Sequence, residues 1–276
     1  MLAHQKCNFH THTCFSDGSD TPEAIVLEAI QQGLHTLGFS DHSFTPFDLH
    51  PCPSAQNLSL GREDVLRLKE KYKGKLRILC GLEQDFHSDA PTLNYDYLIG
   101  SVHYVFKDGV YHSVDRSKEL FLKTVQESFG GDFYRFTSAY YEAVGQVVEK
   151  TNCQIIGHFN LVEKFNEGDA LFSTEDYRYR RPMIDALDAL LKTDAAFEIN
   201  TGAMSRGCRM TPYPSPYVLR RIAEKRGFVV LNSDCHRKES LTYGFADAVR
   251  FARSCGVGGL AILGENGWET HPLKTS

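Results

Sequence analysis

The segment Lys6-Cys7-Asn8-Phe9-His10-Thr11-His12 sets the pattern for the whole chain, because a short strand-like run ends in two histidines. Further short apolar segments follow it, and each is separated from the next by a stretch with helical periodicity. They cover residues 36–40, 77–81, 97–101, 154–158, 196–200 and 228–232, with a weaker eighth candidate at residues 259–263. Strands that alternate with helices in this way predict a parallel sheet with crossover helices.

The stretches between these segments begin and end as helices do. Thr21-Pro22 is a typical helix start and Gly33 a typical stop, and Ser215-Pro216 and Gly227 delimit another helix in the same way. No repeat, low-complexity tract or linker interrupts the series, so we predict a single domain over residues 1–276. Seven or eight β/α units favour a barrel over an open sheet.

Composition argues against several classes of protein. The 276 residues are 42% hydrophobic and 24% charged, which is typical of a globular chain. The net charge of −5 argues against nucleic acid as the main partner, since phosphate backbones usually meet basic surfaces. The sequence contains no run of about 20 apolar residues, so no membrane span is expected. The first residues lack the pattern of a signal peptide. Eight cysteines without a Cys-x-x-Cys pair favour a reducing, cytoplasmic compartment.

Half of the twelve histidines lie at or just past the C-terminal end of a predicted strand. These histidines are His10, His12, His42, His103, His158 and His236, and the acidic residues at equivalent positions are Asp17, Asp41, Glu83 and Asp234. In a parallel barrel this rim carries the active site. A single histidine at a strand end is more often a hydrogen-bonding group than a ligand. Six of them at successive strand ends predict a metal centre.

The spacing of these residues supports the same interpretation. His10-Thr11-His12 and Asp234-Cys235-His236 are both i, i+2 pairs, which place two side chains on one face of an extended chain. Two ligands on one face can bind one metal ion or two adjacent ions. Imidazole together with carboxylate suits Zn, Mn or Fe, whereas an all-oxygen set would indicate Mg or Ca.

Seven motifs follow one another along most of the chain. They are His10-Thr11-His12-Thr13, Asp17-Gly18, Ser40-Asp41-His42, Gly81-Leu82-Glu83, Ser101-Val102-His103, Gly157-His158 and Ser233-Asp234-Cys235-His236. This ordered set resembles the PHP (polymerase and histidinol phosphatase) superfamily. Residues 100–104, 157–159, 198–201 and 212–215 resemble, within it, the PHP-type histidinol-phosphatases of histidine biosynthesis. One loop departs from that pattern, because Gly202-Ala203-Met204-Ser205-Arg206 stands where Gly-Leu-Arg is expected.

The resemblance implies a distorted (β/α)7 TIM-like barrel of the PHP type, with two or three divalent metal ions (Zn, Mn or Fe). It also implies a ligand set for each ion: His10, His12, Glu83 and Asp234 for the first; Glu83, His103 and His158 for the second; Asp17, His42 and His236 for the third. A carboxylate has two oxygens, so Glu83 can bridge ions about 3.5–4 Å apart.

The activity that the resemblance implies is hydrolysis of a phosphate monoester, L-histidinol phosphate, to L-histidinol and phosphate. The expected partner is a small phosphorylated metabolite, with no nucleic acid and no membrane, and the chain is expected to act alone or as a homo-oligomer. Metal ions can acidify a water molecule and neutralise phosphoryl charge, so no serine nucleophile is needed. The expected catalytic residues are Glu83, Asp234 and His236, of which the last two are candidates for protonating the leaving group.

Substrate contacts are assigned to residues near the same strand ends. Arg206 is the preferred phosphate clamp because guanidinium binds phosphate bidentately, and Arg116 and Lys164 are the reserve candidates. Ser101 is a further candidate contact. The ammonium and imidazole of the substrate are expected to meet acidic or amide side chains, for which the candidates are Asp115, Glu163 and Asn200.

Three other functions compete with this one. Another PHP hydrolase could act on nucleotides or small phosphate esters. A PHP-type exonuclease would need basic and aromatic strips for a nucleic-acid strand, and the chain has no basic run. A non-catalytic PHP-like scaffold is expected to lose ligands, whereas all nine expected positions are filled here.

Overall fold

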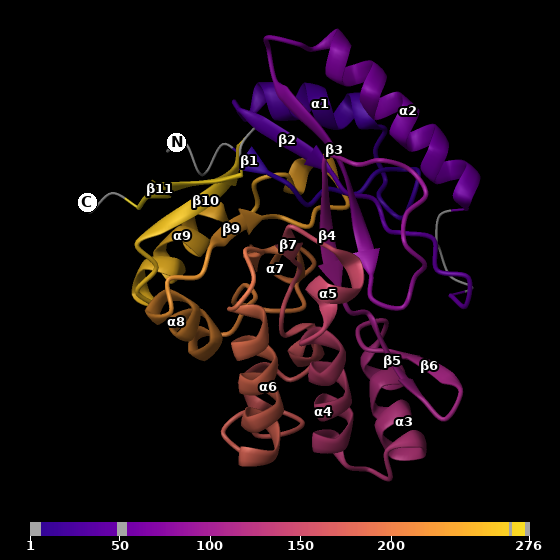
Figure 1. The fold of residues 1–276 in the computed structure, drawn as a ribbon, viewed down its shortest axis with the longest axis vertical. Helices are drawn as coiled ribbons and strands as arrows, with labels where there is room; N and C mark the ends of the chain where they lie inside the picture. The colour runs from indigo at the N-terminus through magenta and orange to yellow at the C-terminus, as the bar shows by residue number, and fades with distance from the viewer. Residues whose placement is uncertain (1–6, 49–53, 265–266, 274–276) are drawn as a thin grey trace.

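The computed structural model describes residues 7–48, 54–264 and 267–273, and its largest element is a barrel of parallel strands (Figure 1). Seven strands pair in the order β1-β2-β3-β4-β7-β8-β9. Their bounds are β1 (Cys7–Asn8), β2 (Thr36–Phe39), β3 (Arg77–Asp85), β4 (Tyr97–Ser101), β7 (Ile155–Ile156), β8 (Ala196–Asn200) and β9 (Val229–Asn232). All seven lie within or beside the predicted segments, so the predicted barrel strands are confirmed.

The barrel is nearly closed, because its first and last strands meet just beyond their ends. Thr11 forms a parallel bridge with Cys235, and the backbone N–H of His12 donates to the Cys235 carbonyl over 3.0 Å. This closure brings residues that follow β1 next to residues that follow β9. The predicted distorted (β/α)7 barrel is therefore confirmed.

Helices surround the barrel and have the ends that the sequence predicts. Thr21 caps α1, where its hydroxyl accepts a hydrogen bond from the Ala24 N–H over 3.3 Å, and α8 begins at Pro216 directly after Ser215. The helices are α1 (Pro22–Gln31), α2 (Ala55–Lys71), α3 (Lys118–Ser128), α4 (Phe133–Val144), α5 (Val147–Thr151), α6 (Tyr177–Leu190), α7 (Gly202–Ser205), α8 (Pro216–Glu224) and α9 (Phe245–Ser254). No helix in the described part of the chain is long and apolar enough to cross a membrane.

The eighth candidate strand does not join the barrel. β10 (Gly259–Leu263) pairs antiparallel with β11 (Trp268–Pro272) and forms a separate two-stranded sheet. The physical reason is the short connection to β11, which lets the two strands form a hairpin, while β9 and β1 already close the barrel. Ala261 of β10 packs into the apolar cluster inside the barrel, together with Cys7 and Val230.

A second hairpin was not predicted. β5 (Tyr104–Lys107) pairs antiparallel with β6 (Val110–Ser113) directly after β4. The sequence signal for this hairpin is the dipeptide Asp108-Gly109, which forms the two-residue turn. The signal is easily missed because each of the two strands has only four residues. The hairpin extends from the rim of the barrel beside α3 (Figure 1).

Tyr97 fills the barrel below the histidine-rich rim. Its side chain is buried, and its hydroxyl donates to the carbonyls of Phe9 and Phe39 over 2.5 and 3.2 Å. Two glycines leave room for the ring: a Cβ on Gly38 would lie 2.2 Å from the Tyr97 Oη, and one on Gly81 would lie 2.3 Å from its Cζ. The ring therefore ties β1 and β2 together just before their chemistry-bearing ends.

This arrangement predicts that Gly81→Ala destabilises the fold. The added methyl group would overlap the Tyr97 ring inside a packed barrel, and such overpacking costs about 1–3 kcal/mol. Urea unfolding should show the loss. Gly258→Ala is the matched control, since a Cβ there meets nothing within 4 Å, and we expect a change below about 0.5 kcal/mol. Equal losses in the two variants would contradict the packing role of Tyr97.

Candidate metal centre

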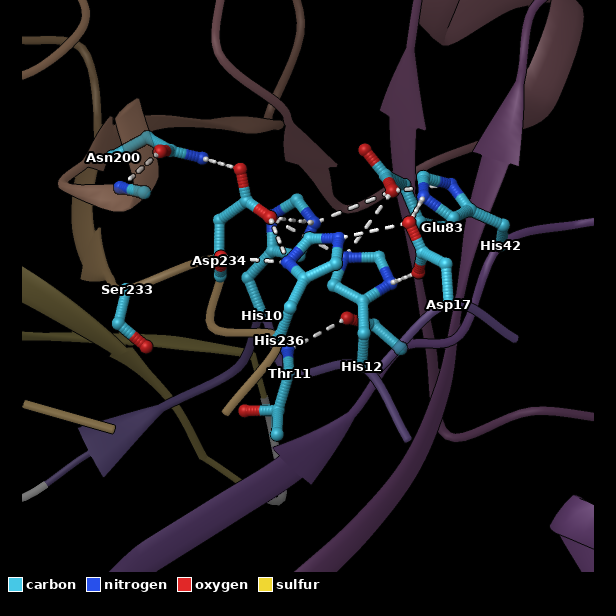
Figure 2. Close-up of polar contacts among 12 residues, drawn as sticks. His10, Thr11, His12, Asp17, His42, Glu83, Asn200, Ser233, Asp234 and His236 are labelled. Atoms are coloured by element: carbon cyan, nitrogen blue, oxygen red, sulfur yellow. Dashed lines mark hydrogen bonds and ion pairs between the residues drawn. The ribbon is translucent and has the colours of Figure 1, made fainter. Parts of the chain in front are cut away.

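The nine predicted ligand residues converge at the C-terminal rim of the barrel, where six strands deliver them. They are His10, His12 and Asp17 after β1, His42 after β2, Glu83 in β3, His103 after β4, His158 after β7, and Asp234 and His236 after β9. Figure 2 shows His10 and His12, which follow β1, pointing toward Glu83 of β3 and Asp234 after β9.

Glu83 lies at the centre of this cluster. Its side chain is 1% exposed. Its Oε1 lies 3.0 Å from His158 Nε2 and 3.4 Å from His103 Nε2. Its Oε2 lies 2.9 Å from His42 Nδ1 and 3.4 Å from His10 Nε2. The two oxygens of Glu83 thus face different sets of histidines, which is the geometry that a bridging carboxylate needs.

Asp234 and Asp17 mark the two other parts of the cluster. Asp234 Oδ1 lies 3.3 Å from His12 Nε2 and 3.9 Å from His10 Nε2. Asp17 Oδ2 lies 3.0 Å from His236 Nε2 and 3.5 Å from His42 Nε2. His12 lies between these parts, because its Nδ1 is also 3.5 Å from Asp17 Oδ1.

Three groups of side chains can each bring their donor atoms within 4.8 Å of one another. They are His12, Asp17, His42 and His236; His10, His12 and Asp234; and His42, Glu83 and His103. These groups overlap with the ligand sets expected from the sequence, and they share His12 and His42 more widely than those sets do. His158 stays next to Glu83, at 3.0 Å.

Several buried polar atoms in the described residues have no hydrogen-bond partner at this rim. They include His10 Nε2, both ring nitrogens of His12, and Glu83 Oε2. An unpartnered buried polar atom costs about 1–3 kcal/mol. A divalent cation would satisfy nitrogen and carboxylate atoms together, so the residues present fit a metal centre.

The electrostatics of the cluster favour cations. Burial opposes the charge on Glu83, but His10, His42 and His103 hold the pKa of that carboxyl well below its usual range. Burial also opposes the charge on His103, yet Glu83 and Asp85 outweigh it and raise the pKa of that imidazole to about 10. The pKa of His12 falls to about 3, because burial and the neighbouring His236 and His42 disfavour its charge. The negative charge of Glu83 and Asp85 therefore favours a positive charge on the neighbouring histidines, and protons and metal ions compete for the same ring nitrogens.

Asp41 stands at a strand end but has a different role. Its carboxylate accepts hydrogen bonds from the backbone and hydroxyl groups of Thr13, each over 2.7 Å, and from the Ser16 hydroxyl over 2.5 Å. These bonds fasten the loop that carries Asp17. The position of Asp41 in the sequence did not show whether its carboxylate would stabilise this loop or bind a metal ion.

A cleft of about 340 Å³ opens over the cluster, and Arg206 lies on its wall. The guanidinium donates to the Asp234 carbonyl over 3.1 Å and to Asp234 Oδ2 over 3.2 Å. It also lies 3.2 Å from His236 Nδ1. Arg206 is about one-third exposed, so it is held against the cluster and faces the cleft.

The two reserve cations also line the cleft, but each is paired with an acid. Arg116 donates to Asp48 over 2.9 Å, and Lys164 donates to Asp115 over 3.0 Å. Of the three candidates for meeting the ammonium or imidazole of a substrate, Asp115 alone lines this cleft.

The other predicted substrate contacts lie beneath or behind the cluster. Ser101 is buried and donates to Glu83 Oε1 over 2.7 Å, so it orients that carboxylate. Asn200 is buried and donates to Asp234 Oδ2 over 3.2 Å. Glu163 is buried and accepts from the Tyr179 hydroxyl over 2.5 Å. None of the three lines the cleft that the described residues form, because their side chains are already engaged inside the fold.

Two carboxylates that touch the cluster were not predicted. Asp85 Oδ2 lies 3.2 Å from His103 Nδ1 and accepts from its backbone N–H over 3.0 Å. Glu198 Oε1 lies 2.7 Å from His10 Nδ1. Sequence signals existed for both, since Asp85 stands two residues after Glu83 on the same strand, and Glu198 is an acid inside the apolar run of β8.

Comparisons with known proteins agree with this fold. Residues 8–202 match the family model described as the PHP domain. The histidinol-phosphatase of Bacillus subtilis is 26% identical over 264 residues, covering 87% of this chain and 97% of that protein. The hisK candidate histidinol phosphatase of Listeria monocytogenes superposes with a TM-score of 0.74 at 22% identity, covering 88% of this chain and 99% of the other.

A second solved structure is the histidinol phosphate phosphatase of Lactococcus lactis, complexed with zinc, L-histidinol and phosphate. It superposes with a TM-score of 0.70 at 21% identity, covering 96% of this chain and 99% of the other. At these identities the two structures show a shared fold, which confirms the predicted barrel type.

Proposed function

The chain belongs to the PHP domain family, and on this premise we propose that it is a metal-dependent phosphomonoesterase that hydrolyses L-histidinol phosphate to L-histidinol and phosphate. The observation that carries the proposal is the buried rim cluster, in which unpartnered histidine nitrogens surround a carboxylate beneath a cleft. The similarity to the Bacillus subtilis histidinol-phosphatase supports the choice of substrate.

We propose that the cluster holds two or three ions of Zn, Mn or Fe. His10, His12, Glu83 and Asp234 would hold one, Glu83, His103 and His158 a second, and Asp17, His42 and His236 a third. Bound there, divalent ions would supply Lewis-acid neutralisation of phosphoryl charge and acidification of a water molecule. The zinc in the Lactococcus lactis structure supports this choice of metals.

The protein groups around the cleft have complementary roles. Arg206 would bind the phosphoryl oxygens, because its guanidinium is fixed at the edge of the cluster by two bonds to Asp234. Asp234 and His236 lie beside it and line the same cleft. Asp234 Oδ2 already accepts hydrogen bonds from Arg206 and Asn200, so of these two candidates we propose His236 as the group that delivers the proton to the leaving oxygen of the substrate.

Arg206→Ala should weaken phosphate binding strongly. Hydrogen bonds to charged groups contribute about 1.5–3 kcal/mol, so we expect kcat/KM to fall about 100-fold and product inhibition by phosphate to weaken. Steady-state kinetics with added phosphate measure both quantities. Arg116→Ala is the comparison, and we expect a smaller loss because that side chain is paired with Asp48. An Arg206→Ala enzyme with unchanged phosphate inhibition would contradict the clamp.

The substrate assignment is tested by phosphate release from a panel of compounds. The panel contains L-histidinol phosphate, nucleoside monophosphates, small phosphate esters and a short DNA. We expect the highest kcat/KM with L-histidinol phosphate. A parallel preparation of the Glu83→Ala variant corrects for contaminating phosphatases. A higher kcat/KM with nucleotides, or nucleotide release from DNA, would instead favour one of the other PHP activities.

A further inference from the structure

Glu198 occupies an unusual position for an acidic side chain. It lies in β8 with no exposed surface, and it is not among the residues that line the cleft. A carboxylate buried at this depth needs compensating partners. Its partners come from the ends of four different strands that carry or border the metal cluster.

Four hydrogen bonds converge on the two oxygens of Glu198. Oε1 lies 2.7 Å from His10 Nδ1 and accepts from Asn232 Nδ2 over 2.9 Å. Oε2 accepts from the backbone N–H of His158 over 2.9 Å and from Asn200 Nδ2 over 2.8 Å. An ionised carboxylate offers about four lone-pair sites, so the capacity of Glu198 is filled.

The directions of these bonds are set by groups that can only donate. Asn232 Oδ1 accepts from the backbone N–H of Phe9 over 2.8 Å, which turns Asn232 Nδ2 toward Glu198. Asn200 Oδ1 accepts from the backbone N–H of Gly202 over 2.8 Å, which turns its Nδ2 the same way. Glu198 therefore accepts on both oxygens, and as an ionised carboxylate it requires the ring atom of His10 that faces it to be the donor.

Glu198 and Glu83 thus differ in what they have left to offer. Glu83 Oε2 has no hydrogen-bond partner and faces histidine nitrogens. Glu198 has no unused acceptor site and touches His10 from the side opposite the cluster. The first arrangement suits a metal ligand, and the second suits a group that orients one.

We propose that Glu198 is a positioning residue of the metal centre, which holds the Nδ1 proton of His10 and so presents the unprotonated Nε2 to the ion beside Glu83 and Asp234. The inference rests on the proposed metal centre. Carboxylates that hold the outer nitrogen of a ligating histidine fix its tautomer and ring orientation, and their removal costs 10–100-fold in metal affinity.

Glu198→Gln tests this role with little change of shape. One end of the new amide is an NH2 group. If this NH2 group faces His10, the Nδ1 of His10 must accept its hydrogen bond. The proton of the imidazole then lies on Nε2, where it prevents that atom from binding the ion. If the NH2 group instead faces the backbone N–H of His158, two hydrogen-bond donors lie opposite each other and the bond to His158 is lost. We expect zinc affinity at the His10 position to fall about 10–100-fold, so that one zinc equivalent is lost first during titration with a competing chelator.

Glu163→Gln is the matched control, because Glu163 is also a buried, hydrogen-bonded carboxylate outside the cleft. We expect this variant to keep the zinc content and affinity of the wild-type chain. Circular dichroism and thermal unfolding of both variants show whether they are folded. A Glu198→Gln chain that binds zinc as tightly as the wild-type chain would overturn the proposal.

A measurement on the unaltered sequence keeps the proposal testable if Glu198→Gln does not fold. Nitrogen-15 NMR of the zinc-loaded protein, labelled at histidine, should detect rings with a protonated Nδ1 and a ligated Nε2. The signals of one such ring should be absent from His10→Gln. Ligation of His10 through Nδ1 would overturn the role of Glu198 while leaving the metal centre intact. A wild-type chain that binds no zinc would overturn both the metal centre and this inference.

Discussion

Replacing Glu83 with alanine is expected to abolish phosphate release and to lower metal occupancy at two ion positions together. The two oxygens of Glu83 face different histidines, His158 on one side and His42 on the other, and the side chain is buried between two of the proposed ion positions. Loss of a shared ligand removes charge stabilisation worth several kcal/mol, which corresponds to a fall in kcat/KM of at least about 1000-fold.

Metal analysis and kinetics on the same preparation check this expectation. The Glu83→Ala chain should lose up to two equivalents of metal relative to the wild-type chain. Glu83→Gln separates charge from shape, since it keeps the side-chain volume and an oxygen for Ser101 to bond. Glu163→Gln controls for the loss of a buried carboxylate elsewhere. Full metal content in Glu83→Ala would refute the shared-ligand arrangement.

Removing the metal is expected to have an effect of similar size. The wild-type chain purified without chelator should contain two to three equivalents of Zn, Mn or Fe. Dialysis against a strong chelator should lower kcat/KM by more than about 1000-fold and lower the melting temperature, because an ion that binds only the folded chain stabilises it. Adding back each metal should restore activity and identify the best one. A metal-free enzyme with full activity would end the proposal.

The affinity for metal should also depend on pH in a defined direction. In the metal-free cluster, Glu83 and Asp85 outweigh burial and raise the pKa of His103 to about 10, and Asp17 and Glu83 raise that of His42. Both imidazoles therefore bind protons at neutral pH, and an incoming ion must displace those protons. Zinc titrations should show weaker binding at about pH 6 than at about pH 8. Equal affinity at the two values would show that no proton is displaced.

Much of the barrel could be predicted because its signals are local. The apolar runs at residues 77–81 and 196–200 lie in strands, and Thr21 and Ser215 start the helices that they were expected to start. The weaker candidate at residues 259–263 is indeed a strand, but its own residues do not show whether it would join the barrel. Its partner β11 and the closure between β1 and β9 decide where it packs.

The ligand candidates were predictable for a geometric reason. Parallel strands that close into a barrel bring all their C-terminal ends to one rim, so residues as distant in sequence as His10 and His236 meet there. The predicted substrate contacts near these ligands were less reliable. Ser101 and Asn200 also lie at strand ends, but their side chains turn inward and bond Glu83 and Asp234. Which way a side chain turns at a strand end depends on the local register, which the spacing of motifs does not reveal.

That the histidines and carboxylates end successive strands could be predicted from the sequence, since the alternation of strands and helices and the order of the motifs are local properties. Which of these buried acids has an oxygen left to bind an ion depends on how the barrel packs. Glu83 and Glu198 are both acids buried in strands, and although a motif marked Glu83 as a ligand, no local pattern shows which hydrogen bonds either carboxylate makes. The closed barrel saturates Glu198 with four donors and leaves an oxygen of Glu83 without a hydrogen-bond partner. The metal centre is therefore defined by which buried acceptors remain unsatisfied, a property of the packed rim and not of any one motif.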